Sequence, residues 1–454
     1  MSGTTIAGMP SLYRIGCSAK QYAATMIELL SRLRLAADDP FRDADVRLLF
    51  GAQAVSFLGS QVSHIAFPLI AVDVIQASNG SIVLLEAAFL MPFVLLSLPV
   101  GALLDRRARR PVMVLMDLLR TAALLVVPLS FLMNALSMPV LYVVLFIIGA
   151  GTLIYDVANQ SYLPELLRGP QLAEANSRIM VIDAGAGVAG PPIAGVIIGR
   201  FGGPLAIFLD SFSYLISALM LRKIKHIEVP PVVTEGTAPS RLRDEIHQGL
   251  RWVLTHPHLR GNALAALLFN FFGAIANGAV LIAYGRRELL LPAELLGLIL
   301  GAGVFGLLIG SLSARRISEQ IGVGRTIILG GFLLPTMPLG FALLDVSLGV
   351  VALAFFSVLF QVVAFFGAAL FHTNQVTYRQ LVTPKALLGR MNASMKWVML
   401  IGMPLGAVVG SIIADQLGLQ AVLYASAIGI IVGPIPLLLS GIASVRRQPE
   451  HTDS

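Results

Sequence analysis

The sequence predicts an all-α integral membrane protein in which twelve transmembrane helices form two pseudo-symmetric six-helix bundles. Its 454 residues are 56% hydrophobic and only 13% charged, whereas a soluble protein carries roughly 25% charged residues. The apolar runs are continuous and close to the ~20 residues that a helix needs to cross a ~30 Å hydrocarbon core. They do not alternate as the strands of an outer-membrane barrel do, so helices are expected.

The apolar runs give the position of each span along the chain. We expect spans near residues 48–72, 81–104, 112–133, 139–158, 178–199, 204–221, 261–284, 295–313, 326–345, 348–371, 397–414 and 420–442. With the N-terminus inside, the outer loops hold only Arg200, Arg286 and Arg287, and the other basic residues of the loops lie inside. This positive-inside distribution predicts a multi-pass protein of the cell (plasma or inner) membrane with both termini cytoplasmic. The net charge of +7 is therefore explained by orientation in the membrane and does not indicate nucleic-acid binding.

The chain repeats itself, which divides it into two halves. The segment 163–177 of the first half matches 383–393 of the second, and internal repeats of this kind build many transporter folds. Between the halves, Pro230-Pro231 and an amphipathic run at 242–254 indicate a linker with a helix on the membrane surface. We expect a cytoplasmic tail at 1–46, a bundle at 47–221, a cytoplasmic linker at 222–260, a bundle at 261–445 and a cytoplasmic tail at 446–454.

A short, strongly charged loop lies between the second and third spans. Its carboxylate is Asp105, and the arginines expected to act with it are Arg106, Arg109 and Arg110. Charge this dense at a membrane edge is costly unless it pairs internally or faces the cytoplasm. Because an arginine holds a carboxylate in a rigid fork, such a loop can lock two helices in one conformation. The alternative is that the loop only anchors the topology.

This loop resembles the one between helices 2 and 3 of the major facilitator superfamily, whose pattern is Gly-x-Leu-x-Asp-Arg-x-Gly-Arg-Arg, with Ala108 where the superfamily has Gly. The segments 208–215, 249–260 and 388–390 resemble the branch of enterobactin exporters and macrolide-efflux proteins, also called transmembrane secretion effectors. The resemblance covers residues 47–445 and implies a secondary transporter with the major facilitator fold.

The resemblance also implies a conformational gate at the charged loop. Asp105 and Arg109 would belong to this gate, with Asp156 on the fourth span as a third partner. Asp117 and Arg120 stand three residues apart on the third span, so they can pair along one helix face. We expect that pair to couple the third span to the same cytoplasmic cluster.

The fifth span is rich in small residues and resembles the Gly-Pro element of facilitator antiporters. Small residues let helices approach closely, and proline kinks a helix. The residues expected to act in this way are Gly187, Gly190, Pro191 and Gly195. Ala194 stands where the antiporter pattern has Gly, so the element predicts close packing and only suggests antiport.

Ionisable groups inside the spans are the natural carriers of a coupling proton, because burial favours the neutral form of a carboxylic acid. Glu86 and Asp183 are the carboxylates considered for this role, with structural pairing as the alternative, and His64 also titrates in the useful range. Asp210 is interpreted as a helix cap. Many members of the family carry an acid where this chain has Ser60, which leaves open that proton coupling is absent.

The substrate pocket is predicted by residue type. Its polar lining should come from Gln53, Ser56, Gln61, Asn270, Asn277 and Gln361, together with His64. Asn270 and Asn277 are seven residues apart and should therefore share one helix face. Phenylalanines of the tenth span suit a bulky amphipathic substrate, unless they face lipid.

The motifs of an ATP-driven pump or an enzyme do not occur in this sequence. None of the five lysines follows a glycine, as a phosphate-binding loop would require, and no paired metal-ligand spacing is found, so we expect no enzyme, cofactor or metal. Cys17 is the single cysteine, which excludes an intramolecular disulfide.

The expected function is export of a hydrophobic or amphipathic small molecule, such as a drug, a macrolide-like antibiotic or a siderophore, by proton antiport. The expected partners are therefore a small-molecule substrate, protons and the lipid bilayer, and a monomer is the default. An importer or lysophospholipid flippase on the same fold, or a non-transporting membrane sensor, are the alternatives.

Overall fold

A computed structural model describes residues 40–104, 107–167, 169–226, 228, 240–384 and 387–446. Within these ranges, twelve helices are long and apolar enough to cross a membrane. The first six spans are α2 (Ala44–Leu69, continued by a π-helical turn at Ile70–Val74), α3 (Asn79–Leu104), α4 (Arg109–Leu132), α5 (Met138–Leu166), α6 (Pro170–Phe201) and α7 (Gly203–Arg222). The other six are α9 and α10 (Pro257–Ile275, Gly278–Arg287), α11 (Ala293–Ile321), α12 and α13 (Val323–Leu333, Thr336–Ala342), α14 (Val350–Leu381), α15 (Leu388–Leu417), and α16 and α17 (Leu419–Val432, Ile435–Leu439). The predicted fold class is confirmed.

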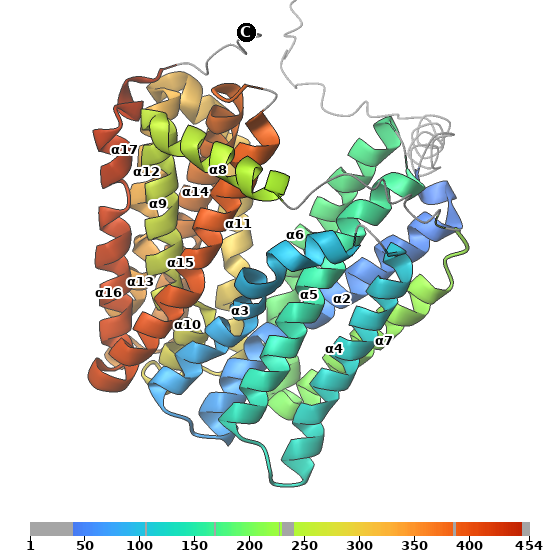
Figure 1. The fold of residues 1–454 in the computed structure, drawn as a ribbon. Helices are drawn as coiled ribbons and strands as arrows, with labels where there is room; N and C mark the ends of the chain where they lie inside the picture. The colour runs from blue at the N-terminus through green and yellow to red at the C-terminus, as the bar shows by residue number, and fades with distance from the viewer. Residues whose placement is uncertain are drawn as a thin grey trace, which may run out of the picture.

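The spans form two bundles that meet along two pairs of helices (Figure 1). In the first bundle, α4 and α2 pack on α7, and α5 packs on α3 and α4. In the second, α14 packs on α11 and α12, and α15 packs on α9. Across the divide, α3 contacts α15 and α6 contacts α11, so the second helix of each half meets the fifth helix of the other. The residue boundaries of the bundles, linker and tails stay predictions.

Three predicted spans are interrupted helices. The seventh is broken between Ile275 and Gly278, and the ninth and twelfth are broken before Pro335 and Pro434, each of which is the N-cap of the next helix. Proline lacks the backbone N–H that would continue the helical ladder, so the last two breaks have a local cause. In a bilayer such breaks occur where the freed backbone is buried in protein or lines a cavity.

The amphipathic run of the linker is the helix α8 (Ser240–Thr255). It lies at one end of the second bundle, against α15 (Figure 1). Val253 is fully buried there among Leu259, Met391 and Met395, and Arg390 donates a hydrogen bond to Gln248 at 2.6 Å. The last turns of α8, through Val253, therefore pack on the second bundle.

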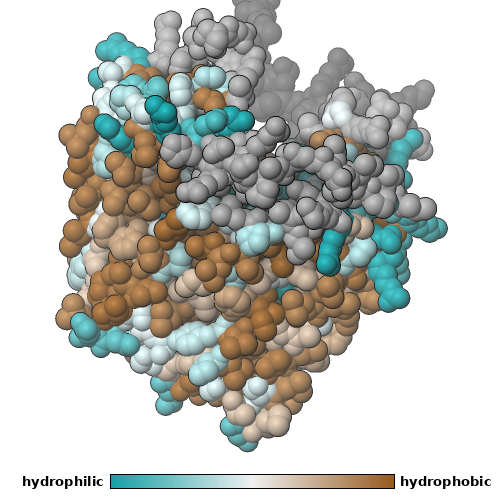
Figure 2. Space-filling model, viewed as in Figure 1, coloured by the Kyte–Doolittle hydropathy of each residue, from teal (hydrophilic) through white to brown (hydrophobic). Residues whose placement is uncertain are grey.

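The two ends of the molecule, the terminal face and the distal face, carry different parts of the chain. The terminal face carries the first turn of α2 at Ala44 and the last described turn, η5 (Ile442–Ser444). The distal face carries the connection from Val74 to Asn79 and the end of α10 at Arg287. Between them, the flank of the molecule is mostly hydrophobic, with hydrophilic residues toward the ends (Figure 2). This banding suits a bilayer around the middle of the helices.

The glycines predicted for close packing lie where α6 meets other helices. A Cβ added to Gly195 would lie 3.0 Å from Glu294 Cα and would also collide with the Ala293 carbonyl oxygen of α11. One added to Gly187 would lie 3.3 Å from a methyl group of Val304. Because the obstacle at Gly195 is backbone, no side-chain rotation can relieve it. The two bundles can approach this closely only because that position is glycine.

Replacing Gly195 by valine should weaken the contact between the bundles, because overpacking costs about 1–3 kcal/mol. We expect the purified Gly195→Val protein to melt at a lower temperature in detergent than the wild type. Gly185→Val is the matched control on the same helix, since an added Cβ there meets nothing within 4 Å. Equal melting temperatures for both variants and the wild type would contradict the assignment.

Candidate binding cavity

A cavity of about 650 Å³ lies between the two bundles. Clefts of ~300–1,000 Å³ hold drug-sized ligands in proteins. Of the polar residues predicted to line a pocket, Ser56, Gln61, His64, Asn277 and Gln361 do so. Both bundles contribute to the wall, so any relative motion of the bundles changes the shape of the cavity.

Two of the predicted lining residues lie outside the cavity wall. The amide of Gln53 is buried, and the side chain of Asn270 donates to the Ala266 carbonyl of its own helix at 2.8 Å. The expectation that Asn270 and Asn277 share one helix face was wrong, because α9 ends before Asn277. The Asn277 side chain instead caps α10 by accepting a hydrogen bond from the Val280 amide at 3.1 Å.

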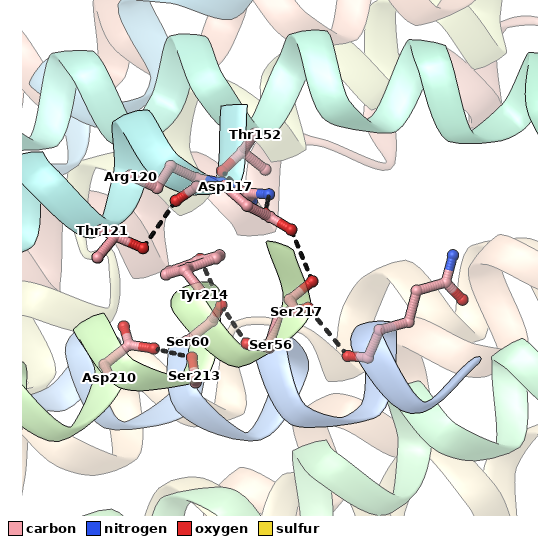
Figure 3. Close-up of polar contacts among 11 residues, drawn as sticks. Ser56, Ser60, Asp117, Arg120, Thr121, Thr152, Asp210, Ser213, Tyr214 and Ser217 are labelled. Carbon is pink, nitrogen blue, oxygen red and sulfur yellow. Dashed lines mark hydrogen bonds and ion pairs between the residues drawn. The ribbon is translucent and has the colours of Figure 1, made fainter. Parts of the chain in front are cut away.

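The predicted pair on the third span is present and buried. Arg120 forms an ion pair with Asp117, and both side chains are almost inaccessible to solvent. Ser217 of α7 donates to the other carboxylate oxygen of Asp117 at 2.6 Å (Figure 3). The guanidinium lies over two aromatic faces, 4.2 Å from the ring centroid of Tyr214 and 4.6 Å from that of Tyr155.

Among the described residues, the partners of this pair lie on α5 and α7 and do not include Arg109 or Arg110, so the expected coupling to the charged cluster stays a prediction. Asp117 stands eight residues after Arg109, which is ~12 Å along a helix. At that depth the pair faces α5 and α7 in the core of the first bundle, and Arg120 also lines the cavity. The sequence predicted Arg120 as part of the gate, whereas in the structure its guanidinium lies in the wall of the cavity.

The gate expected at the charged loop is only partly visible, because Asp105 and Arg106 lie outside the described residues. Arg109 pairs with Glu165 of α5 at 2.9 Å. The backbone amides of Arg109 and Arg110 donate to the carboxylate of Glu228, and the Arg110 guanidinium donates to the Ile224 carbonyl. A carboxylate is favourable at a helix N-terminus, and the capping residue of α4 supplies no side-chain acceptor of its own.

The carboxylate of α5 that pairs with Arg109 is therefore Glu165. The resemblance had implied Asp156 as the partner on this helix. Asp156 stands nine residues before Glu165, about 13 Å away along the helix, and it lines the cavity. Sequence reasoning missed both Glu165 and Glu228. The sequence gives little indication of their roles, because each is a single acidic residue near the basic end of a span.

Asp210 was interpreted as a helix cap, and this interpretation was wrong. The helix α7 begins at Gly203, so Asp210 lies two turns inside it and is only 2% exposed. Its carboxylate accepts hydrogen bonds from Ser63 of α2 and, at 2.8 Å, from Ser213 one turn later on α7. Asp210 also belongs to the cavity wall.

The cavity is strongly asymmetric in charge. Among the described residues, every ionisable side chain in its wall comes from the first bundle, namely His64, Glu86, Arg120, Asp156, Asp183, Asp210, Tyr155 and Tyr214. The second bundle supplies Asn277 and Gln361 as polar side chains, and otherwise apolar residues such as Leu300, Met337 and Phe365. Because Arg120 is already paired with Asp117, the remaining carboxylates make this wall acidic.

Polar contacts hold the bundles together at the distal face. Arg286 forms an ion pair with Asp73 at 3.0 Å, and Arg287 donates to the Asn79 side chain and to the Ala77 carbonyl. The Gly80 amide donates to Asp415 at 2.7 Å. Each contact joins the first bundle to the second, so the distal end of the cavity is closed in this structure.

Comparison with known proteins identifies relatives over most of the chain. Residues 36–451 match the family described as transmembrane secretion effector. The multidrug efflux pump Tap of Mycolicibacterium fortuitum is 26% identical over 413 residues, which cover 88% of this chain and 94% of Tap. An uncharacterised MFS-type transporter of Bacillus subtilis, YkuC, is 26% identical over 311 residues, 65% of this chain and 71% of YkuC.

Solved transporter structures share the fold at low sequence identity. A crystal structure of the nucleoside transporter NupG matches with a TM-score of 0.67 and 11% identity, covering 88% of this chain and 99% of that one. A bacterial homologue of the iron transporter ferroportin, in an inward-facing state, matches with a TM-score of 0.68 and 17% identity, covering 88% and 98% of the two chains.

Removing Arg120 should leave Asp117 as an unpaired buried carboxylate. Breaking a buried pair in this way costs ~3–5 kcal/mol, so we expect Arg120→Ala to yield little folded protein by fluorescence-detected size-exclusion chromatography. Arg120→Met combined with Asp117→Leu should recover folded protein, because neither charge is then left alone. Arg315→Ala is the control, since the Arg315–Glu319 pair is exposed and such pairs contribute little. Normal folding of Arg120→Ala would contradict this assignment.

Proposed function

The chain belongs to the transmembrane secretion effector family of the major facilitator superfamily, and from this membership we propose that it exports a hydrophobic or amphipathic small molecule by proton antiport. A secondary transporter of this superfamily moves its substrate by alternating access of a central site. The observation that carries the proposal is the cavity between the bundles, with an acidic wall on one side and an apolar wall on the other. The relative named as a multidrug efflux pump supports export as the direction.

The orientation we propose places the terminal face in the cytoplasm. This face carries most of the basic residues near the ends of the described spans, among them Arg109, Arg222, Lys223, Arg316 and Arg446. The distal face carries Arg200, Arg286 and Arg287. Positive charge favours the cytoplasmic side. With this orientation, the contacts at the distal face hold the outer side together, which supports an inward-facing conformation.

Alternating access then requires two sets of contacts to exchange. Opening toward the outside breaks the distal contacts of Asp73 with Arg286 and of Gly80 with Asp415. Closing the cytoplasmic side would bring the first turn of α4, which Asp105 and Arg106 precede in the sequence, toward the second bundle. Glu165 and Glu228 hold this turn of α4 within the first bundle in the proposed inward-facing state.

Proton coupling is supported by the ionisable groups of the cavity. Glu86, Asp183 and His64, which the sequence singled out, all lie in its wall. His64 packs against Phe89, with 5.9 Å between ring centroids, beside the Glu86 helix. A group that faces a cavity of alternating access can take a proton on one side and release it on the other.

A second cavity favours lipid handling as the alternative function. It also measures about 650 Å³ and lies at the distal half, between the first bundle and the start of α11. Its wall is largely apolar and includes Phe131, Phe201 and Leu205, which are exposed on the outside of the helices. An acyl chain would fit such a surface. The transport experiment below separates this alternative from drug export.

Inverted membrane vesicles that contain the protein should accumulate ethidium, an amphipathic cation, when a proton gradient is imposed. We expect Asp105→Asn vesicles to show little uptake at equal protein level, because the gate is then broken. Vesicles without the protein are the control. Absence of ethidium uptake by the wild type, together with movement of a fluorescent lysophospholipid, would replace drug export by the lipid function.

The proposed orientation can be tested with the native cysteine. Cys17 is the single cysteine of the chain, so a membrane-impermeant maleimide reports on one position. We expect labelling of inverted vesicles and none of right-side-out vesicles until detergent is added. Labelling from the outside would reverse the proposed topology and the direction of opening with it.

A further inference from the structure

The core of the first bundle holds more carboxylates than guanidinium groups. Arg120 of α4 is paired with Asp117, and it also attracts Asp156 of α5 and Asp210 of α7 electrostatically. The Tyr214 ring lies against the guanidinium, and the Tyr214 hydroxyl is hydrogen-bonded to Ser60 of α2 at 2.8 Å (Figure 3). If Arg120 and these carboxylates are all ionised, the buried cluster carries a net negative charge.

A net charge buried in a membrane-spanning bundle is unfavourable, and the usual relief is to take up a proton. The question is which carboxylate receives it. Asp117 is a poor proton acceptor, because protonating it would leave the buried guanidinium of Arg120 without the carboxylate that pairs with it. Asp117 should therefore stay ionised.

Asp210 has partners that suit both of its protonation states. Ser63 and Ser213 donate to its oxygens in the ionised state. A hydroxyl can also accept a hydrogen bond, so either serine can rotate and accept from a protonated Asp210. The site can thus load and release a proton without leaving a buried polar atom unpaired.

The charged and titratable groups around Asp210 come from every helix that packs on α7, and from the rest of the cavity wall. They are His64 on α2, Asp117 and Arg120 on α4, and Asp183 on α6, with Tyr214 on α7 itself and Glu86, Tyr155 and Asp156 further round the cavity. Among these, only Arg120 is a permanent cation, and Asp117 already pairs with it. A proton on Asp210 therefore reduces the negative charge of the wall that a substrate meets.

We propose that Asp210 is the proton-binding site of the antiport cycle and that the substrate it is coupled to is an amphipathic cation. This inference rests on the proposed function. A cation in the cavity favours ionised Asp210, and a proton on Asp210 disfavours the cation, so each ligand displaces the other by linkage. Such exclusion is what antiport requires, since proton entry then releases the substrate. The apolar wall of the second bundle, including Met337 and Phe365, receives the hydrophobic part of the cation.

The test measures proton release when a cation binds to the purified full-length protein in detergent. The probe is tetraphenylphosphonium, with binding followed by calorimetry and proton release by a pH-sensitive dye in weakly buffered solution, from acid to neutral pH. The wild type should release up to about one proton per cation bound, as linkage requires. Asp210→Asn should bind the cation and release none. Glu319→Gln, which changes an exposed carboxylate outside the cavity, is the control and should still release the proton.

Proton release that persists in Asp210→Asn would overturn the proposal and move the site to another cavity group. Cation binding by the wild type without proton release would also overturn it, while leaving ethidium transport by vesicles untouched. A wild type that neither binds the probe nor transports ethidium would instead contradict the proposed function.

A second variant serves if Asp210→Asn does not fold. Ser63→Ala combined with Ser213→Ala removes both hydroxyl donors that stabilise the ionised carboxylate. Proton release on cation binding should then shift to higher pH than in the wild type, because the proton is held more tightly. An unchanged pH profile in this folded variant would contradict the assignment.

Discussion

A guanidinium in the middle of a membrane-spanning bundle has to be neutralised and hydrogen-bonded, and much of the first bundle is arranged around that requirement. Asp117 supplies the charge from the preceding turn of α4, and Tyr155 and Tyr214 supply aromatic faces from α5 and α7. Even Gly151 of α5 takes part, since a Cβ there would lie 2.9 Å from Arg120 Cγ. The cost of an unpaired ion at this depth explains why several helices contribute to one side chain. The same cluster forms part of the cavity wall, which links the stability of the bundle to its chemistry.

The two bundles share an arrangement of helices but not their chemistry. The first presents ionisable groups to the cavity and the second presents apolar residues and two amides. One wall of the cavity carries buried ionisable groups and the other is apolar. This arrangement suits a ligand that has a charged end and a hydrophobic body. Motion between the walls is then restrained by the distal contacts and by the glycine-mediated packing of α6 on α11, where Gly195 meets backbone. The contacts of Asp73 and Arg286 are partly exposed, and exposed pairs are weak enough to be exchanged in each cycle.

Much of the fold could be predicted from the sequence, because the length and apolarity of each span are set by the bilayer and are visible in composition. The ion pair of Asp117 with Arg120 could also be predicted, since a spacing of three places both on one helix face. The roles of Asp210 and Asn277 could not. Each depends on where a helix begins or breaks, and an apolar run looks the same on both sides of a break such as the one before Gly278. The partnership of Arg109 with Glu165 depends on how α4 and α5 align side by side, which leaves no periodic signal in either segment.

Rocking of the two bundles about the cavity can be tested by measuring distances across both faces of the molecule at once. Spin labels at Ser78→Cys and Gln416→Cys would report on the distal face, and labels at Lys223→Cys and Gln320→Cys on the terminal face, each pair in a Cys17→Ser background. Pulsed electron paramagnetic resonance in liposomes at acid and neutral pH would give both distributions. We expect the distal distance to lengthen where the terminal distance shortens as the pH changes. Two distances that stay fixed, or that lengthen together, would contradict it.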